Sequence, residues 1–202
     1  MEFNCIFPVT VAVSNLERSL TDIECVFLEN LEKLPSSGHL VSSDYYVLDQ
    51  PELKELKNFI EKELREYYQT VYSADESQLV ITQSWVNYST KNNIHNIHIH
   101  PNSFISGVFY AKADSSQDAI IFHKNLYESA FDVRPKEENF FNVKKQHVPV
   151  NSGMLILFPS TLMHEVPMID TDRTRVSIAF NSFFTGKIGS YDHACELVIK
   201  DN

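Results

Sequence analysis

Glycine is scarce in this sequence: five glycines occur among 202 residues, and no glycine-rich loop of the kind that cradles nucleotide phosphates is present. Cysteine is scarcer still, with three widely separated residues and no CxxC pair, namely Cys5, Cys25 and Cys195. An odd, scattered set favours a reducing compartment over a disulfide framework. A GxSxG nucleophile elbow is absent as well. These absences argue against a phosphate-loop enzyme, a disulfide-stabilised secreted domain and a hydrolase built on that elbow.

Basic residues are few relative to acidic ones, with 17 Lys and Arg against 27 Asp and Glu and a net charge of −10. No Lys- or Arg-rich block stands out, so tight non-specific binding to nucleic acid or to an anionic membrane surface is not expected. The opening stretch MEFNCIFPVTVAVSN has an acidic second residue and no basic region before a long apolar run. We therefore expect neither a signal peptide nor a membrane span, and a cytoplasmic protein. A homo-oligomer is compatible with the sequence.

The composition is otherwise that of an ordinary globular protein, with 43% apolar and 22% charged residues. A length of 202 residues fits one domain with a sizeable core. No internal repeat, low-complexity tract or linker divides the chain. We expect an N-terminal strand with supporting helices over 1–77, a β-rich core over 78–186 and a C-terminal extension over 187–202.

Two helices are expected in the N-terminal part. After a short strand-like segment, SNLE reads as a capping box with Ser14 as the N-cap and Glu17 three residues later. Pro51 suits the first position of a second helix, whose apolar residues recur at spacings of three and four as far as Val71. Both apolar stripes are expected to face the core.

From Gln78 onward the sequence consists of short β-rich runs separated by turn residues, such as QLVITQSWVNYS, GMLILFPST and TRVSIAFNSFF. Many short strands after a helical part are typical of helices packed against a β-sandwich or barrel.

Three of the eight histidines lie within six residues, in the stretch NNIHNIHIHPNS. Side chains two apart on a β-strand point to the same face, so His98 and His100 are expected to face the same way and His95 to point elsewhere. Two imidazoles on one strand form a natural chelate for Fe, Zn, Cu or Ni. Taken alone, the pair is also compatible with a polar strand rich in histidine.

A second polar group follows near the far end of the chain, in GMLILFPSTLMHEVPMIDTDRTRVSIAFN. His164 lies 64 residues beyond His100, so it would bring a third ligand from a different strand. Arg175 opens the next strand, where alternation places Ser177 and Ala179 on the same face. A single arginine on an inner face needs an anionic partner, because an unpaired buried charge is very costly.

The order HxH, SGVFY, GMLILFPS, HEV and RVSIAFN, over roughly residues 80–185, resembles the non-haem Fe(II)/2-oxoglutarate-dependent oxygenases. The likeness is greatest to a prolyl-hydroxylase-like branch with a His-x-His-Pro-x-Ser motif. This resemblance implies a mainly β fold with flanking α-helices around a double-stranded β-helix (jelly-roll, cupin-like) core. It also implies a dioxygenase that uses Fe(II), 2-oxoglutarate and O2 and hydroxylates an unidentified substrate, with release of succinate and CO2.

Carried over position by position, the resemblance makes His98 the first metal ligand, His100 the residue at the acidic position and His164 the distal ligand. Arg175, eleven residues after His164, becomes the residue that pairs with the C5 carboxylate of 2-oxoglutarate. Arg173 is the competitor for this role, but RVSIAFN continues as the strand that follows the anchor in the family.

The family pattern has a carboxylate where this sequence has His100. Three neutral imidazoles would leave the iron centre one unit more positive, yet three-histidine iron sites are viable in cupin-type dioxygenases. We expect all three histidines to bind. The alternatives are a site of His98 and His164 with water in the third position, and a site that uses His100 and a residue of the Pro-Asn-Ser turn.

Other side chains are candidates for the pocket. Tyr110 matches a family position that often hydrogen-bonds the 2-oxoglutarate carboxylate. Trp85 and Asn87 lie two apart on the strand that leads into the site. Ser103 shapes the turn after the HxH motif or faces a ligand, and Ser177 shares a face with the anchor arginine.

Three aspartates, Asp114, Asp118 and Asp132, could replace the missing carboxylate, but they lie in loop-like, polar sequence surroundings. His95 is expected at the surface or behind the ligands, and His39 is expected to be exposed.

Two rival functions stay open. A cupin-like metalloprotein would use three histidines without 2-oxoglutarate, and Arg175 would then have no role. A jelly-roll binding or structural module would keep the scaffold without the metal. The loops over 114–118 and 127–139 would determine the substrate, and neither encodes a substrate class.

Overall fold

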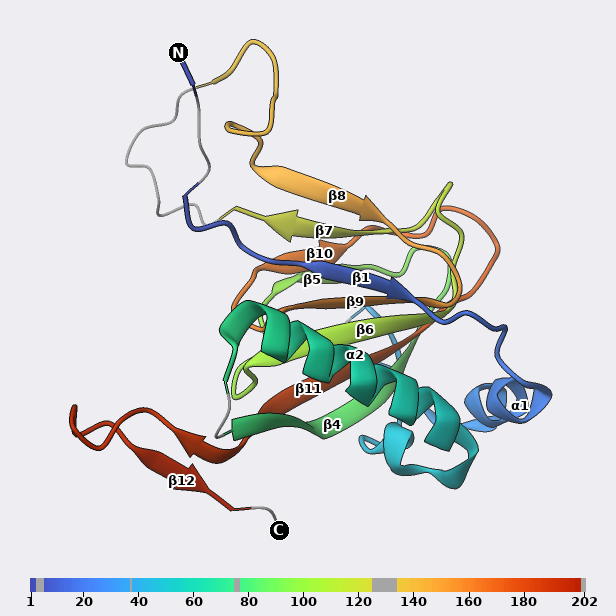
Figure 1. Ribbon diagram of the computed structural model, residues 1–202. Coiled ribbons are helices and arrows are strands. Elements are labelled where there is room, and N and C mark those ends of the chain that lie inside the picture. The colour runs from blue at the N-terminus through green and yellow to red at the C-terminus, as the bar shows by residue number, and fades with distance from the viewer. Residues whose placement is uncertain (3–5, 37, 75–76, 125–133, 201–202) are drawn as a thin grey trace.

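The computed structural model describes residues 1–2, 6–36, 38–74, 77–124 and 134–200. Two antiparallel β-sheets pack face to face, and helix α2 crosses the outer face of the larger one (Figure 1). The predicted fold class, a mainly β jelly-roll core with flanking helices, is confirmed.

Among the described residues the larger sheet has eight strands, and β11 lies near its centre. Their order is β1 (Ala12–Asn15), β9 (Met154–Pro159), β6 (Ile105–Lys112), β11 (Arg175–Ile188), β4 (Ser77–Ser89), β3 (His39–Ser42) and β2 (Lys33–Ser36), with β12 (Leu197–Ile199) paired to β11. β11 therefore brings the C-terminal part of the chain beside two strands from its middle, because its register runs alongside β4 and β6 at the same time.

The smaller sheet, with four strands in the part of the chain that the structure describes, covers the inner face of the larger one. Their order is β5 (His95–His98), β10 (His164–Val166), β7 (Ala119–His123) and β8 (Lys145–Pro149). An apolar cluster that includes Val108 and Ile156 of the larger sheet with Ile120 and Phe122 of the smaller one lies between them. Figure 1 shows these four strands together on one side of the molecule.

The second predicted helix is confirmed. Two 3-10 turns, η1 (Val47–Asp49) and η2 (Pro51–Leu53), lead into α2 (Lys54–Tyr72). The buried side chains of α2 recur at helical spacing and are Leu56, Ile60, Leu64, Tyr67 and Tyr68. Because this stripe packs on the larger sheet, the helix is held by apolar burial rather than by its charged outer face. None of the described helices is long and apolar enough to cross a membrane.

The first helix begins later than the sequence predicts. Ser14 lies in β1 and pairs with Leu155 of β9, so the predicted capping box was wrong. The helix α1 (Asp22–Asn30) begins after Thr21, whose hydroxyl accepts from the Glu24 amide while the Glu24 carboxylate accepts from the Thr21 amide. Pairing at the sheet edge uses the backbone around Ser14, and TDIE supplies the true capping box.

Strand β6 separates the apolar core from the site, because its alternate side chains point to opposite faces. Ile105 and Phe109 belong to the core beneath α2, whereas Val108 and Tyr110 face the smaller sheet. Gly107 has no room for a side chain: a Cβ there would lie 2.2 Å from the ring of Phe180. The SGVFY segment thus packs tightly against the core with its outer face and contributes side chains to the site with its inner face.

Candidate metal centre

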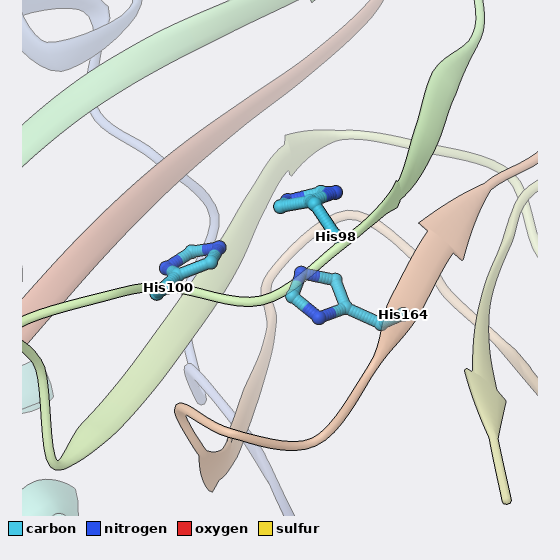
Figure 2. Close-up of side chains that lie close together, drawn as sticks. All are labelled: His98, His100 and His164. Atoms are coloured by element: carbon cyan, nitrogen blue, oxygen red, sulfur yellow. The ribbon is translucent and has the colours of Figure 1, made fainter. Parts of the chain in front are cut away.

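Three histidines meet where the smaller sheet faces the larger one (Figure 2). His98 ends β5 and His164 begins β10, and the two are direct partners in the ladder. His100 follows two residues later, in the segment that leads to β6. One nitrogen from each ring lies within 4.8 Å of the others. The structure therefore brings together the three histidines that the sequence singles out, and it leaves His95 outside the group.

The rings are arranged as a compact triangle. The ring centroids are 4.3 Å apart for His98 and His164, 5.1 Å for His100 and His164, and 5.3 Å for His98 and His100. His164 and His100 are 2% and 8% exposed, whereas His98 is exposed. The group is consequently anchored in the interior and open to solvent on the His98 side.

All three rings have the tautomer that a metal ligand needs. Their Nδ1 atoms lie 2.6 Å from Asn96 O for His98, 2.6 Å from Asn181 Oδ1 for His100 and 3.0 Å from Leu162 O for His164. Because these oxygens can only accept, each Nδ1 carries the proton and donates. Each Nε2 therefore presents a lone pair, which is the form that binds a metal.

Burial also keeps the inner rings neutral. Desolvation lowers the pKa of His164 to about 3, although the hydrogen bond to Leu162 opposes the shift. Desolvation likewise lowers the pKa of His100 against the effect of its bond to Asn181. Neutral imidazole is the ligand form, so these two rings need not lose a proton before an ion binds at neutral pH.

A cavity of about 420 Å³ adjoins the three histidines. Four of the predicted pocket residues line it: Trp85, Asn87, Tyr110 and Ser177. Ser103 is not among them, in keeping with the turn-shaping alternative: its hydroxyl lies in a buried network, 3.2 Å from the main-chain oxygens of Ile105 and Ser182. The Pro-Asn-Ser turn therefore uses this serine to hold the backbone rather than to face the cavity.

Arg175 reaches the same cavity from the inner face of β11. It is 2% exposed, and its Nη1 donates to Asp118 Oδ1 over 2.9 Å. Its Nη2 is buried and has no hydrogen-bond partner among the described residues. A buried guanidinium nitrogen without an acceptor is unfavourable, so this atom indicates a missing anionic group.

Asp118 lies in the loop just before β7, as expected, but it is buried rather than solvated as its sequence context suggests. Its side chain is fully buried and accepts from both Arg173 and Arg175. Burial opposes its ionisation, but the bonds from Arg173 hold its pKa below the usual value. It lies away from the histidine triangle as the partner of the arginines. Asp114 is exposed, and Asp132 lies outside the described residues, as does part of the 127–139 loop.

The two competing arginines have different surroundings. Both amino groups of Arg173 donate to Asp118, at 2.6 and 2.8 Å, and its side chain is 21% exposed. Arg173 is not among the described residues that line the cavity, whereas Arg175 is. Arg173 thus neutralises Asp118, and the charge of Arg175 is left for the cavity.

Tyr110 supplies a second donor on the cavity wall. Its side chain is fully buried, and desolvation raises its pKa above that of an ordinary phenol. The hydroxyl therefore keeps its proton at neutral pH and can donate to an acceptor in the cavity.

Two further histidines, His39 and His95, line the cavity, although neither was expected to do so. His39 and His95 stack with ring centroids 3.7 Å apart, and His39 was expected to be exposed. Ser89 Oγ lies 3.0 Å from His95 Nε2, and Asn87 Oδ1 lies 3.1 Å from His39 Nε2. The stack connects the β2–β3 hairpin to β5, a contact between distant segments that no local pattern in the sequence indicates.

The His95 ring should make stability depend on pH. Burial first, and the neighbouring His39 ring second, lower the pKa of His95 to about 3. The unfolded chain takes up this proton near pH 6.5, so between these values it binds more protons than the folded protein. Stability should therefore fall on acidification from about pH 6.5, by at most about 1.4 kcal/mol per pH unit from this ring.

Urea unfolding of the metal-free protein at several pH values would measure this effect. The variant His95→Gln lacks the titrating ring, so its stability should fall less steeply between about pH 6.5 and about pH 4.5. Equal slopes for the two proteins would contradict the assignment, whatever the difference in their absolute stability.

Comparisons with known proteins agree with this architecture. Residues 83–181 match the model of a family described as "Putative 2OG-Fe(II) oxygenase". HygX from Streptomyces hygroscopicus, solved with nickel, 2-oxoglutarate and hygromycin B bound, is 13% identical with a TM-score of 0.60, covering 86% of this chain and 82% of its own. The carbocyclase SnoK from nogalamycin biosynthesis is 13% identical with a TM-score of 0.59, covering 96% and 88%.

A 2OG-Fe(II) oxygenase family protein from Burkholderia pseudomallei is likewise 13% identical, with a TM-score of 0.55 and coverage of 78% and 74%. Among curated proteins, none matches this sequence. At such identities the structural likeness concerns the fold, and the family model adds the segment that carries the three histidines and the cavity arginine. The match to the family model spans 83–181, just under half of the chain, and includes His98, His100, His164 and Arg175.

Proposed function

We propose that this protein is a non-haem Fe(II)- and 2-oxoglutarate-dependent dioxygenase that hydroxylates an unidentified substrate and releases succinate and CO2. One observation carries the proposal. A triangle of imidazoles with hydrogen-bonded Nδ1 atoms and a buried arginine with an unsatisfied Nη2 lie in the same cavity. The His-x-His-Pro-x-Ser motif supports the finer assignment to a prolyl-hydroxylase-like branch.

The donor set fits a borderline metal ion. Imidazole nitrogens suit Fe, Ni, Cu and Zn, and three of them leave further coordination positions open. His98, His100 and His164 would hold the ion through their Nε2 atoms. When bound, Fe(II) supplies the redox chemistry that activates O2, which amino-acid side chains do not supply.

The cavity also fits a dicarboxylate. Arg173 and Asp118 compensate each other, so Arg175 contributes a net positive charge to the cavity wall. Its Nη2 would donate to the C5 carboxylate of 2-oxoglutarate, and the protonated Tyr110 hydroxyl would donate beside it. Charge-assisted bonds of this kind, made away from water, orient the co-substrate.

Replacement of the usual carboxylate by His100 changes the charge of the centre. A 2-His-1-carboxylate site neutralises one unit of the ion's charge, and three imidazoles neutralise none. The anionic co-substrate would then be the first group to neutralise part of the charge of the ion. We expect metal affinity and 2-oxoglutarate affinity to depend on each other, because each reduces the electrostatic penalty of the other.

The test is formation of succinate from 2-oxoglutarate by the purified protein. We expect turnover, slow in the absence of the primary substrate, that requires both Fe(II) and O2 and stops when the iron is chelated. The matched control is protein loaded with Zn(II), which has no redox chemistry and should give no succinate. Absence of Fe(II)-dependent succinate across a broad set of candidate substrates would contradict the proposal.

A three-histidine cupin-like metalloprotein that does not use 2-oxoglutarate is the second candidate, and the missing carboxylate is the observation that favours it. The unsatisfied nitrogen of Arg175 argues for the first proposal, since a cavity without an anion would leave that atom buried without an acceptor. Metal binding without any 2-oxoglutarate binding would select the second candidate.

We also propose a cytoplasmic location. The two cysteines within the described residues, Cys25 and Cys195, are exposed and free, as expected for a reducing compartment.

A further inference from the structure

His100 is held differently from the other two histidines. The Nδ1 atoms of His98 and His164 each donate to the main-chain oxygen two residues earlier, of Asn96 and Leu162. The Nδ1 of His100 instead donates to a side chain, the amide oxygen of Asn181, over 2.6 Å. Its orientation therefore depends on a residue 81 positions away, on β11.

Asn181 reaches His100 because of its place in β11. Alternation along the strand puts Asn181 on the same face as Arg175, Ser177 and Ala179. Three of these residues line the cavity: Arg175, Ser177 and Ala179. The ladder with β4 is irregular between Asn181 and Ser182, and irregularities of this kind aim side chains beside functional sites.

The amide is itself fixed from behind. Ser106 donates to Asn181 Oδ1 over 3.1 Å, and the Ser106 hydroxyl lies 2.8 Å from that of Ser160. The Ser160 hydroxyl lies 2.7 Å from that of Ser103, which lies 3.2 Å from the main-chain oxygens of Ile105 and Ser182. Ser106 and Ser160 are fully buried. The three serines come from different segments of the chain and together support the Asn181 amide oxygen.

We propose that Asn181 is a positioning residue for the metal ligand His100. It fixes the Nδ1-protonated tautomer of that ring and directs the Nε2 lone pair toward the other two ligands. The amide does so without adding charge to the site. This inference rests on the proposed metal site and concerns only how its third ligand is oriented.

Metal affinity, measured independently of turnover, tests the inference. Binding of cobalt(II) would be followed by absorption for the wild-type protein, Asn181→Leu and Asn181→Asp. Loss of the acceptor in Asn181→Leu should weaken binding by roughly 10- to 100-fold, the range for partners that orient ligands. Asn181→Asp keeps an acceptor and should bind at least as tightly as the wild type.

The matched control is Thr185→Val on the same strand. Thr185 is 5% exposed, and its hydroxyl has no partner among the described residues, so the nearly isosteric change should leave cobalt affinity unaltered. Equal affinities for all Asn181 variants, or equal weakening in Asn181→Leu and Asn181→Asp, would overturn the inference. Failure of the wild-type protein to bind cobalt or iron would instead overturn the metal site itself.

A measurement on the unaltered metal-free protein covers the case in which a variant does not fold. Nitrogen-15 NMR of labelled histidine distinguishes the two neutral tautomers. We expect the His100 ring to be protonated on Nδ1, and a ring protonated on Nε2 would overturn the inference.

Discussion

Replacing His164 with alanine should abolish stoichiometric metal binding. His164 is the most buried member of the triangle, and its ring centroid lies 4.3 Å from that of His98 and 5.1 Å from that of His100. Without it, two imidazoles would remain, one of them exposed. Partners that only orient a ligand change affinity by about 10- to 100-fold. Loss of a ligand itself should exceed that range.

The measurement is metal content by elemental analysis after dialysis against trace Fe(II), together with cobalt titration. His147→Ala is the matched control, because His147 is exposed on β8, outside the triangle, and its loss should leave binding intact. Thermal unfolding would verify that both variants are folded. Equal metal content in His164→Ala and in the wild type would exclude the three-histidine site.

The second large effect concerns Arg175. Arg175→Ala should weaken binding of 2-oxoglutarate to the metal-loaded protein by roughly 30-fold to over 1000-fold, since loss of one partner of a buried charged pair costs about 2–5 kcal/mol. Cobalt affinity in the absence of 2-oxoglutarate should change little. Calorimetry under anaerobic conditions would give the dissociation constant without turnover.

Arg173→Ala is the comparison that separates the two arginines. Both residues bind Asp118, so each variant leaves this buried carboxylate with one arginine partner. The Arg173 variant should lose less 2-oxoglutarate affinity than Arg175→Ala: Asp118 would then compensate the charge of Arg175, but the unsatisfied Nη2 of Arg175 would still line the cavity. A larger loss in Arg173→Ala than in Arg175→Ala would show that the anchor has been assigned to the wrong residue.

The parts of the site that sequence could predict are those with a local pattern. The spacing of His98 and His100 predicts that both side chains point to the same face of a strand. The alternation after Arg175 predicts the strand that begins there. Helix α2 is likewise predicted by its own apolar stripe. In each case neighbouring residues determine the feature, so no knowledge of distant contacts is needed.

Features that depend on distant partners were missed. Asp118 lies in a polar stretch and yet is buried, because two arginines from beyond residue 170 converge on it. Asn181 is the last residue of RVSIAFN, and the alternation of that segment places it on the same face as Arg175. Its partner His100 could be identified only in three dimensions. The false capping box at Ser14 has the same cause: pairing with β9 overrides the local preference.

The ladder between β5 and β10 is short, with only His164 opposite His98 and Val166 opposite His95. In the order of the smaller sheet, β10 is the sole neighbour of β5 among the described strands. An ion shared by His98 and His164 would therefore act as a cross-link between two weakly joined strands. At a free concentration 100-fold above its dissociation constant, such an ion stabilises the fold by about 2.7 kcal/mol. Iron starvation would then shorten the lifetime of the protein against proteolysis as well as lower its activity.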